Sequence, residues 1–362
     1  MKKYYTRACN FFYGLNSKKL VKARSALPLC GDKKISFNQV EIFTKDKKKV
    51  NSIIVDIKDI KKLPQGVKKK VYKDIKKITK KREFLNNKNH LLMGVLNLTP
   101  DSFSDGGKFN SLKKATQRIK FMIEAGADII DVGGESTRPG SKIVSQKLEV
   151  QRVKHVLKNF KNKYPKTLLS VDTRKSLVMN FSLKHKMDII NDVSCFKFDP
   201  KSFNTIKGHN IWKIIHHMQG TPQTMQIKPQ YNNVLLDIYD FFEKEIKKFK
   251  KQKYNKKLIL DPGIGFGKNL KHNLMILNKI SLFHSLGFPI LIGTSRKRFI
   301  SQVSEKYDTK ERIGGTLASI TFSLSQGVKI FRVHNVEEIK QGILIFEALL
   351  KKWKKNILAL TE

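Results

Sequence analysis

Arginine is scarce in this chain and gathers where a phosphate group could be bound. Lys and Arg together number 73, but only 11 of these residues are Arg. Arg makes planar, two-pronged contacts with phosphate oxygens. Six arginines adjoin the ends of short apolar runs or the helices expected to follow them: Arg138, Arg174, Arg296, Arg298, Arg312 and Arg332. With Lys297 and His334 beside them, one phosphate-bearing ligand explains this distribution better than a nucleic-acid surface does.

Other apolar runs end in hydrogen-bond acceptors. Asp172, Asn191 and Asp261 supply two carboxylates and an amide, a set that can bind a flat heterocycle presenting N–H donors. Burying a carboxylate is costly unless such donors pair with it. The alternative for Asp172 and Asp261 is that each only caps the helix that follows.

The segment "MGVLNLTPDSFSDGGKFN", residues 93–110, changes abruptly from an apolar strand to a polar loop. The loop holds Asp101 and Asp105, three hydroxyl residues and two adjacent glycines. It is either a functional loop above a site or a purely structural turn.

Two further motifs are weaker signals. The loop "DPGIGFGKN" has glycines that permit close backbone approach, but it lacks the GKS or GKT of a phosphate-binding P-loop. His216 and His217 are adjacent, so a strand would point them to opposite faces and they could not share a metal ion. Core packing or a hydrogen bond is the expected role of this pair, while Met218 can offer a soft apolar face to a flat ring.

Eight short apolar runs must position these residues, and most are separated by segments of helical spacing. The runs cover residues 90–98, 128–134, 168–173, 188–194, 211–218, 258–263, 289–295 and 329–334. They lack alternation, as expected for parallel strands covered on both faces. Eight β-then-α units over about 270 residues match a (β/α)8 TIM barrel.

A doubly wound open sheet is the alternative, but it would use only some of its strand ends. Here every run finishes in polar residues able to do chemistry. They are Asn97, Glu135 with Thr137, Asp172, Asn191, His217, Asp261, Ser295 with Lys297, and Arg332 with His334. In a barrel all eight carboxyl ends meet on one face, which favours the barrel.

The first 89 residues differ from the rest. Residues 1–90 hold 26 Lys and Arg against 7 Asp and Glu. Strand-like runs at 35–43 and 51–57 precede a basic stretch of weak helical periodicity at 68–84. We expect a small basic N-terminal extension (1–89) of unknown role, followed by a catalytic barrel (90–362).

Composition narrows the class of protein. The formal charge of +43 suggests nucleic acid, but the lysines are spread along the chain, so the biased amino-acid usage of an AT-rich genome is the simpler explanation. No apolar run is long enough to span a membrane and no secretory signal is recognisable. Cys9, Cys30 and Cys195 form no metal or disulfide spacing, so we expect a cytoplasmic protein.

Eight motifs in order give the chain a family resemblance over about residues 90–355. They are "MGVLNLTPDSFSDGG", "DVGGESTRPGS", "SVDT", "INDVS", "HMQGTPQTMQ", "DPGIGFGK", "GTSRKRFI" and "FRVHNV". Together they resemble dihydropteroate synthase of folate biosynthesis, a (β/α)8 barrel and a transferase. The resemblance implies condensation of 6-hydroxymethyl-7,8-dihydropterin diphosphate with p-aminobenzoate, giving 7,8-dihydropteroate and diphosphate, with Mg²⁺ assisting.

The resemblance also implies roles for matching residues. The pterin site would comprise Asp172, Asn191, Met218, Asp261, Phe266, Lys297 and Arg332. Diphosphate would be held by Asn97, Arg138, Arg332 and His334, with Asn97 also a ligand of Mg²⁺. The aminobenzoate site would comprise Phe103, Thr137, Pro139, Ser295 and Arg296, with Phe266 beside it.

Mobile loops at 98–107 and 135–141 would close over the substrates. Asp101 and Asp105 would help order the first loop around Mg²⁺, diphosphate and the amine, and with Lys297 they are the expected catalytic residues. The family implies a homodimer through late helices, to which "ILIFEALLKKW" could contribute, although core packing explains that stretch equally well.

Two other functions are weaker expectations. A methyltetrahydrofolate-binding methyltransferase would share the pterin pocket but would not need the diphosphate cations. An RNA-binding protein would interleave Arg and aromatic residues along one surface.

Overall fold

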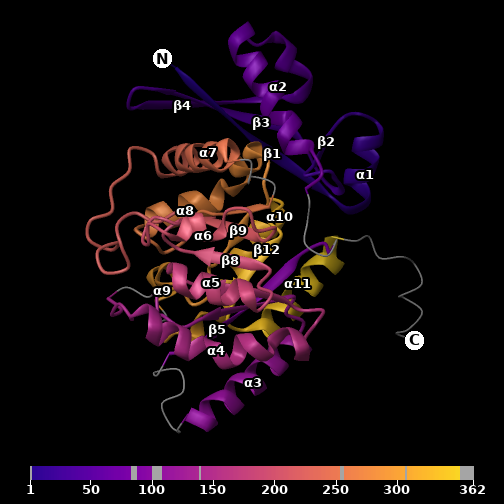
Figure 1. The fold of residues 1–362 in the computed structure, drawn as a ribbon. Coiled ribbons are helices and arrows are strands. Elements are labelled where there is room, and N and C mark those ends of the chain that lie inside the picture. The colour runs from indigo at the N-terminus through magenta and orange to yellow at the C-terminus, as the bar shows by residue number, and fades with distance from the viewer. Residues whose placement is uncertain are drawn as a thin grey trace, which may run out of the picture.

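The computed structural model describes residues 2–82, 88–99, 108–137, 140–252, 257–305 and 308–350. It comprises an eight-stranded barrel and an antiparallel N-terminal unit that packs against it (Figure 1). Across the described residues, no helix is long and apolar enough to cross a membrane.

The barrel is built from eight parallel strands. Neighbouring strands follow the order β10-β9-β8-β7-β6-β5-β12-β11, and a parallel bridge between Leu260 and Ile290 joins the two ends of this path. The strands are β5 (Leu91–Asn97), β6 (Ile129–Gly133), β7 (Leu168–Asp172), β8 (Ile189–Asp192), β9 (Trp212–His216), β10 (Leu258–Asp261), β11 (Leu291–Ile292) and β12 (Ile330–Val333). The predicted TIM barrel is therefore confirmed, and each strand lies inside its predicted run.

Helices follow the strands and cover the outside of the barrel (Figure 1). They are α3 (Lys108–Glu124), α4 (Gln146–Lys163), α5 (Ser176–Lys184), α6 (Ser202–Ile206), α7 (Val234–Lys251), α8 (Leu270–Asn278), α9 (Arg298–Ser304), α10 (Ile313–Ser325) and α11 (Val336–Leu350), with 3-10 turns η4 (Ile280–Leu286) and η5 (Lys310–Arg312). After α3 and α10 the chain turns at Gly126 (φ 98°) and Gly327 (φ 85°), a conformation that glycine adopts without strain.

Apolar residues fill both sides of the strands. One cluster lies inside the barrel and includes Leu91, Met93, Ile129, Trp212 and Ile259. A larger cluster packs the outward-facing strand residues against the helices. Strands buried on both faces need no polar alternation, which explains their continuous apolar sequence.

The N-terminal unit is a four-stranded antiparallel sheet with helices. Its long strand β3 pairs with β1 on one edge and with β2 and β4 on the other. The elements are β1 (Lys3–Tyr13), α1 (Gly14–Lys22), β2 (Leu27–Leu29), β3 (Asp32–Asp46), β4 (Lys49–Asp56), η1 (Ile57–Lys62) and α2 (Gln65–Thr79). The strands expected at 35–43 and 51–57 are confirmed, and residues 68–79 of the basic stretch belong to α2.

This unit has its own core and is also tied to the barrel. Val40, Val71 and Ile78 belong to a separate apolar cluster. Polar contacts join β1 and β3 to α7 and η4: Lys3 and Tyr5 contact Asp240, Lys45 contacts Asp237, and Arg7 contacts Ser281. The extension is therefore a folded layer on one side of the barrel.

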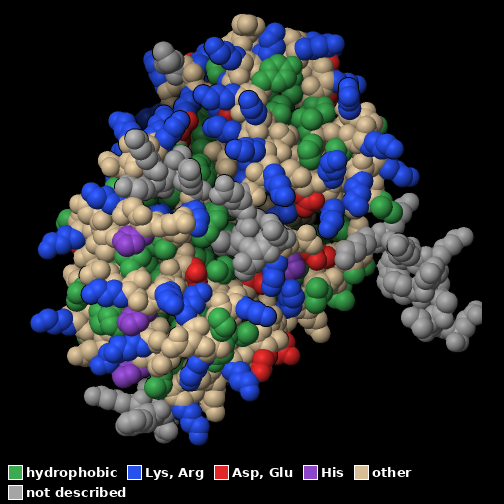
Figure 2. Space-filling model, turned by 45° about the vertical axis from the view of Figure 1, so that its right-hand side comes forward, with side chains coloured by type: hydrophobic (Ala, Val, Ile, Leu, Met, Phe, Trp, Pro, Cys, Tyr) green, Lys and Arg blue, Asp and Glu red, His purple; other side chains and the backbone are tan. Residues whose placement is uncertain are grey.

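Basic side chains are scattered over both parts of the molecule (Figure 2). In that view the blue side chains are spread over the surface and do not gather in one patch.

Candidate active site

A cavity of about 730 Å³ opens at the carboxyl ends of the barrel strands. Its lining includes most of the predicted residues that the structure describes: Asn97, Thr137, Asp172, Asn191, Asp261, Phe266, Ser295, Arg296, Lys297, Arg332 and His334. The predicted convergence of strand ends on one site is confirmed for these residues.

The alternation of side chains between the two faces of each strand explains why polar groups meet in this cavity. In β9, Trp212 and Ile214 belong to the interior cluster, and His216, two residues further on, lines the cavity. In β12 the same spacing leads from Ile330 to Arg332. Since alternate residues share a face, one side of each strand is apolar within the barrel and polar at its mouth.

Arg332 joins two carboxylates in the floor of the cavity. Its Nε donates to Asp131 Oδ2 at 2.7 Å, and its Nη2 donates to Asp172 Oδ2 at 2.8 Å. Asp131 also accepts hydrogen bonds from Ser170 and Asn191. One guanidinium thus serves two buried carboxylates.

Burial and the neighbouring charge of Asp131 outweigh the attraction of Arg332 and raise the pKa of Asp172 to about 7. Asn191 donates through Nδ2, while its buried Oδ1 has no hydrogen-bond partner among the described residues. A carboxylate and an unsatisfied amide oxygen are both ready to accept N–H groups from a heterocycle.

Asp261 lies across the same floor. Its Oδ1 accepts a hydrogen bond from the Gly263 backbone N at 2.8 Å, and its Oδ2 lies 3.9 Å from His216 Nε2. Burial raises the pKa of Asp261 to about 6 and lowers the pKa of His216 well below its usual range. The helix that follows, α8, is capped by Asn269, so Asp261 is not its cap.

Lys297 and Phe266 form one wall. The Lys297 ammonium lies 4.0 Å from the centre of the Phe266 ring, which meets His216 edge to face. A Cβ added to Gly265 would lie 3.0 Å from Lys297 Cδ, so a glycine there leaves room for this lysine. The wall offers a cation and an aromatic face to a bound ring.

Residues after β11 and β12 are linked to one another. The Ser295 hydroxyl lies 3.1 Å from His334 Nδ1, and Arg296 donates to Asn335 Oδ1 through Nε and Nη2. Arg296 has a φ of 61°, a left-handed conformation that is uncommon for a residue with a side chain. Arg298 and Arg312 also line the cavity, so cations gather on this flank.

Three residues named from the sequence, His217, Met218 and Arg174, lie outside the lining of the main cavity. His216, not His217, lines the main cavity; His217 is buried and its Nδ1 lies 3.0 Å from Lys268 Nζ. Met218 lines a neighbouring cavity of about 200 Å³, which shares His216 with the main one. Arg174 also lines this smaller cavity.

Glu135 takes part in a buried charge cluster. Its carboxylate accepts hydrogen bonds from Arg174 Nε and Lys175 Nζ, both at 2.9 Å, and from the Val144 backbone N. Lys175 also donates to Glu149. The cluster joins Glu135 and Val144, which lie on either side of residues 138–139, to the start of α5. Glu135 was expected to line the catalytic cavity.

Several predicted residues lie outside the described part of the chain. They are Asp101, Phe103, Asp105, Arg138 and Pro139. The lid hypothesis for residues 98–107 and 135–141 rests largely on this group and stays a prediction.

Asp131, which accepts a hydrogen bond from Arg332, is a residue that the sequence interpretation missed. It lies inside the run "DIIDVGG", where it was taken for part of an apolar strand. Its spacing was the available signal, because Asp131 follows the interior residue Ile129 by two positions.

One oxygen donor at the cavity, that of Asn97, is of the kind that could hold a Mg²⁺ ion together with substrate phosphates. Asn97 contributes an amide oxygen at the rim, and Mg²⁺ commonly combines one or two protein oxygens with substrate phosphates. Within the described ranges, no three His, Cys, Asp or Glu side chains form a complete metal site.

Comparison with known proteins places the barrel among enzymes that bind pterins. Residues 93–334 match a family described as pterin binding enzyme. The dihydropteroate synthase of Escherichia coli strain K12 is 42% identical over 260 residues, which cover 72% of this chain and 91% of that relative. The match to the family begins only after the N-terminal unit.

Solved structures agree. The chain is similar to Clostridium difficile dihydropteroate synthase, crystallised in the presence of pteroic acid, with a TM-score of 0.68 and 38% identity; the match covers 74% of this chain and all (100%) of that one. It is also similar to Xanthomonas albilineans dihydropteroate synthase with 4-aminobenzoic acid, with a TM-score of 0.67 and 31% identity, covering 72% and 93%.

Proposed function

The chain belongs to the dihydropteroate synthase family of pterin-binding enzymes, and we propose that its main cavity binds both substrates of the condensation that this family performs. The reaction is a transfer in folate biosynthesis. It joins p-aminobenzoate to 6-hydroxymethyl-7,8-dihydropterin diphosphate and gives 7,8-dihydropteroate and diphosphate. The observation that carries the proposal is the division of one cavity into an acceptor-rich floor and a cationic flank.

In this proposal the floor binds the pterin edge. Asp172, Asn191 and Asp261 accept hydrogen bonds from its N–H and amino groups, while Lys297 donates to its acceptors. Phe266 and Arg332 lie against the ring. Burying these carboxylates is tolerable because the pterin supplies the donors that ionised carboxylates need.

The cationic flank stabilises the leaving group. Arg332, His334, Asn97 and Arg138 contact the diphosphate, and Mg²⁺ bound with Asn97 would neutralise charge that develops on it. The C–O bond between the pterin methylene and the diphosphate breaks, and the electron-rich ring spreads the positive charge left on carbon. The cations thus act where negative charge grows.

The amine needs little activation. Its nitrogen already carries a lone pair, attacks the methylene carbon and then loses one proton. Thr137, Pro139, Phe103, Ser295 and Arg296 form the aminobenzoate site, with Met218 assigned to the pterin from the neighbouring cavity. Closure of the loop that holds Asp101 and Asp105 would exclude water from the cation.

The proposal extends to the organisation of the protein. Residues 1–89 form an extension distinct from the catalytic barrel of residues 90–362. A cytoplasmic homodimer is proposed, joined through late helices, because Phe322 on α10 and Leu344, Ile345 and Leu349 on α11 are exposed. Light scattering of the protein and of a Leu344→Lys variant tests the dimer, which the lysine should dissociate.

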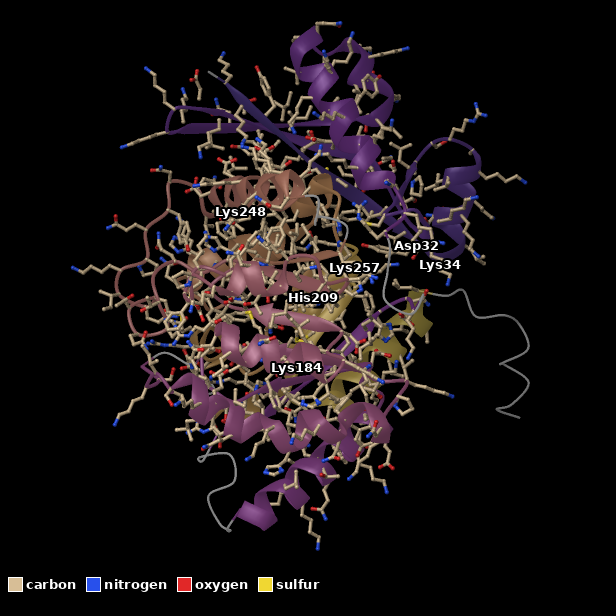
Figure 3. The ribbon with its side chains drawn as sticks, in the orientation of Figure 1. Asp32, Lys34, Lys184, His209, Lys248 and Lys257 are labelled. Atoms are coloured by element: carbon tan, nitrogen blue, oxygen red, sulfur yellow. The ribbon has the colours of Figure 1, made fainter. Side chains whose placement is uncertain are left out.

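Diphosphate release tests the function directly. Release should require the pterin diphosphate, p-aminobenzoate and Mg²⁺, and should be lost in folded Asp172→Ala and Lys297→Ala variants. Lys184→Ala, which changes an exposed lysine outside the cavity (Figure 3), is the matched control and should retain activity. Well-folded protein that releases no diphosphate would contradict the proposal and would favour a pterin-binding methyltransferase.

A further inference from the structure

A second cavity, of about 340 Å³, lies between the N-terminal unit and the barrel. Its barrel side is formed by residues that precede β11, β12 and β5, such as Ile290, Lys329 and Asn89. It is therefore at the amino ends of the strands, at the opposite end of the barrel from the catalytic cavity. Asp32, labelled in Figure 3 at the junction of the two parts, lines it too.

The cavity contains a thiol beside a base. The Cys30 sulfur lies 3.3 Å from His284 Nδ1, and His284 Nε2 lies 2.9 Å from the Gln326 backbone oxygen. Because a carbonyl oxygen can only accept, Nε2 carries a proton, which leaves Nδ1 to take the thiol proton or to donate to the thiolate. A nucleophile, a base within reach and a group that orients the base form the arrangement found in thiol-activated sites.

The charges around Cys30 favour its ionised form. Arg82 and Lys329 are cations that face it, with Lys329 paired to Asp32 at 3.0 Å, and the His284 ring lies beside it. Burial alone would raise the pKa of Cys30, but its interactions with His284 foremost, and with Arg82 and Lys329, lower it to about 7. Burial instead raises the pKa of Cys9 and of Cys195.

The same cavity is suited to an acidic reagent. Lys81 and Lys88 also line the cavity, although Lys88 is paired with Asp128. The lining cations therefore outnumber the single lining carboxylate, which is Asp32. The buried Nε of Arg82 has no hydrogen-bond partner among the described residues. This surplus of cations attracts a carboxylate.

We propose that Cys30 is a modification site that reacts by thiol–disulfide exchange with small anionic disulfides. The Cys30 thiolate attacks one sulfur of the reagent and forms a mixed disulfide, and the other sulfur leaves as a thiolate. Electrons balance without a further oxidant. The proton that Cys30 gives up passes to His284 or solvent.

The test uses the full-length protein and three symmetrical disulfides: glutathione disulfide (anionic), hydroxyethyl disulfide (neutral) and cystamine (cationic). Each rate is divided by the rate of the same reagent with free cysteine, which removes differences between leaving groups. Intact mass and peptide mapping locate the adduct. At pH 7, Cys30 should react at least about tenfold faster than Cys9 or Cys195, because only its thiolate is well populated.

The normalised rate should be highest for the anionic disulfide, lower for the neutral one and lowest for the cationic one. Added salt should reduce the differences between these rates. Cys30→Ser should remove the fast phase and Cys195→Ser should keep it. Arg82→Gln should slow glutathione disulfide more than hydroxyethyl disulfide; if that variant does not fold, the salt series on the unaltered protein gives the same information. A Cys30 thiol that reacts no faster than Cys9, or that shows no charge preference, would overturn the proposal.

Discussion

The Nη2 of Arg332 donates to Asp172 Oδ2 at 2.8 Å, so the last strand of the barrel is joined to the third across the mouth of the catalytic cavity. This contact fixes the guanidinium in the floor of the site. It also leaves Asp172 with acceptor capacity directed at a ligand, because a carboxylate has more lone pairs than one N–H can use.

Removing the arginine should be costly. Arg332→Met leaves Asp131 and Asp172 without their shared cation, and breaking a buried pair in this way typically costs about 3–5 kcal/mol. Urea unfolding at pH 8, above the Asp172 pKa of about 7, measures the loss. Adding Asp172→Asn to Arg332→Met should recover part of it. Equal stability of Arg332→Met and the unaltered protein would contradict the network.

Binding of a pterin should strengthen as pH rises. The pKa of Asp172 is about 7 and that of Asp261 is about 6, and the pterin N–H groups favour the ionised carboxylates. Affinity should therefore increase between about pH 5 and pH 7.5, by up to about tenfold per pH unit for each group. Calorimetry with a pterin across this range tests it, and Asp172→Asn should flatten the upper part of the profile.

Asp172 and Asp261 also make stability depend on pH, in the opposite direction to an ion-paired carboxylate whose pKa is lowered. Their folded pKa values exceed the unfolded value, so the native state binds more protons than the unfolded state between about pH 4 and pH 7. Their contribution to the free energy of unfolding is therefore present at low pH and lost as pH rises through that window. In the Asp172→Asn variant the Asp172 share of this pH dependence should disappear from denaturation curves, while the Asp261 share should remain.

A single methyl group should disturb the lysine wall. Gly265 has a φ of 79°, and a Cβ there would lie 3.0 Å from Lys297 Cδ. Gly265→Ala should therefore cost about 1–2 kcal/mol of stability and raise the KM for the pterin substrate. Gly66→Ala is the control, because a Cβ there meets nothing within 4 Å and lies in α2, so it should be neutral or stabilising. Similar losses in both variants would argue against a specific clash at Lys297.

The sequence was sufficient to predict the barrel and the end of it that holds the site, because each strand consists of apolar residues followed by a polar residue. The sequence could not show which side chains of each strand face the cavity, because the strands lack polar and apolar alternation. His216 and His217 are both polar and adjacent, and only the interior positions of Trp212 and Ile214 decide which one faces the cavity. Asp131 was hidden for the same reason.

The first strand of the N-terminal unit escaped prediction for a related cause. Residues 3–13, "KYYTRACNFFY", mix charged, aromatic and small side chains with no clean period. Tyr5 contacts α7, and Ala8 packs in the core of the N-terminal unit. The strand therefore contacts other elements on both of its faces. Asn10, with a φ of 54°, interrupts the regular strand conformation.

The attachment of the N-terminal unit should depend on Glu41. This side chain is 3% exposed and accepts hydrogen bonds from Arg7 of its own sheet, from Lys279 of the barrel and from Ser52. Glu41→Ala leaves both cations without their carboxylate, so the free energy of unfolding at pH 7 should fall by about 3 kcal/mol. Hydrogen exchange of β1 and β3 amides should quicken, since the sheet loses the Arg7–Glu41–Lys279 link to the barrel.

The pH dependence of that loss identifies its cause. Although burial opposes ionisation, the hydrogen bonds from Lys279 and Arg7 lower the pKa of Glu41. The stability that Glu41 contributes is therefore present above its unfolded pKa of about 4.3 and is lost as pH falls through the lower folded value. The gap between Glu41→Ala and the unaltered protein should shrink as pH falls from 7 towards 3. Glu124→Ala, at an exposed i,i+4 pair with Lys120, should change stability by no more than about 0.5 kcal/mol. A gap that is constant with pH would show that Glu41 acts through packing and not through its charge.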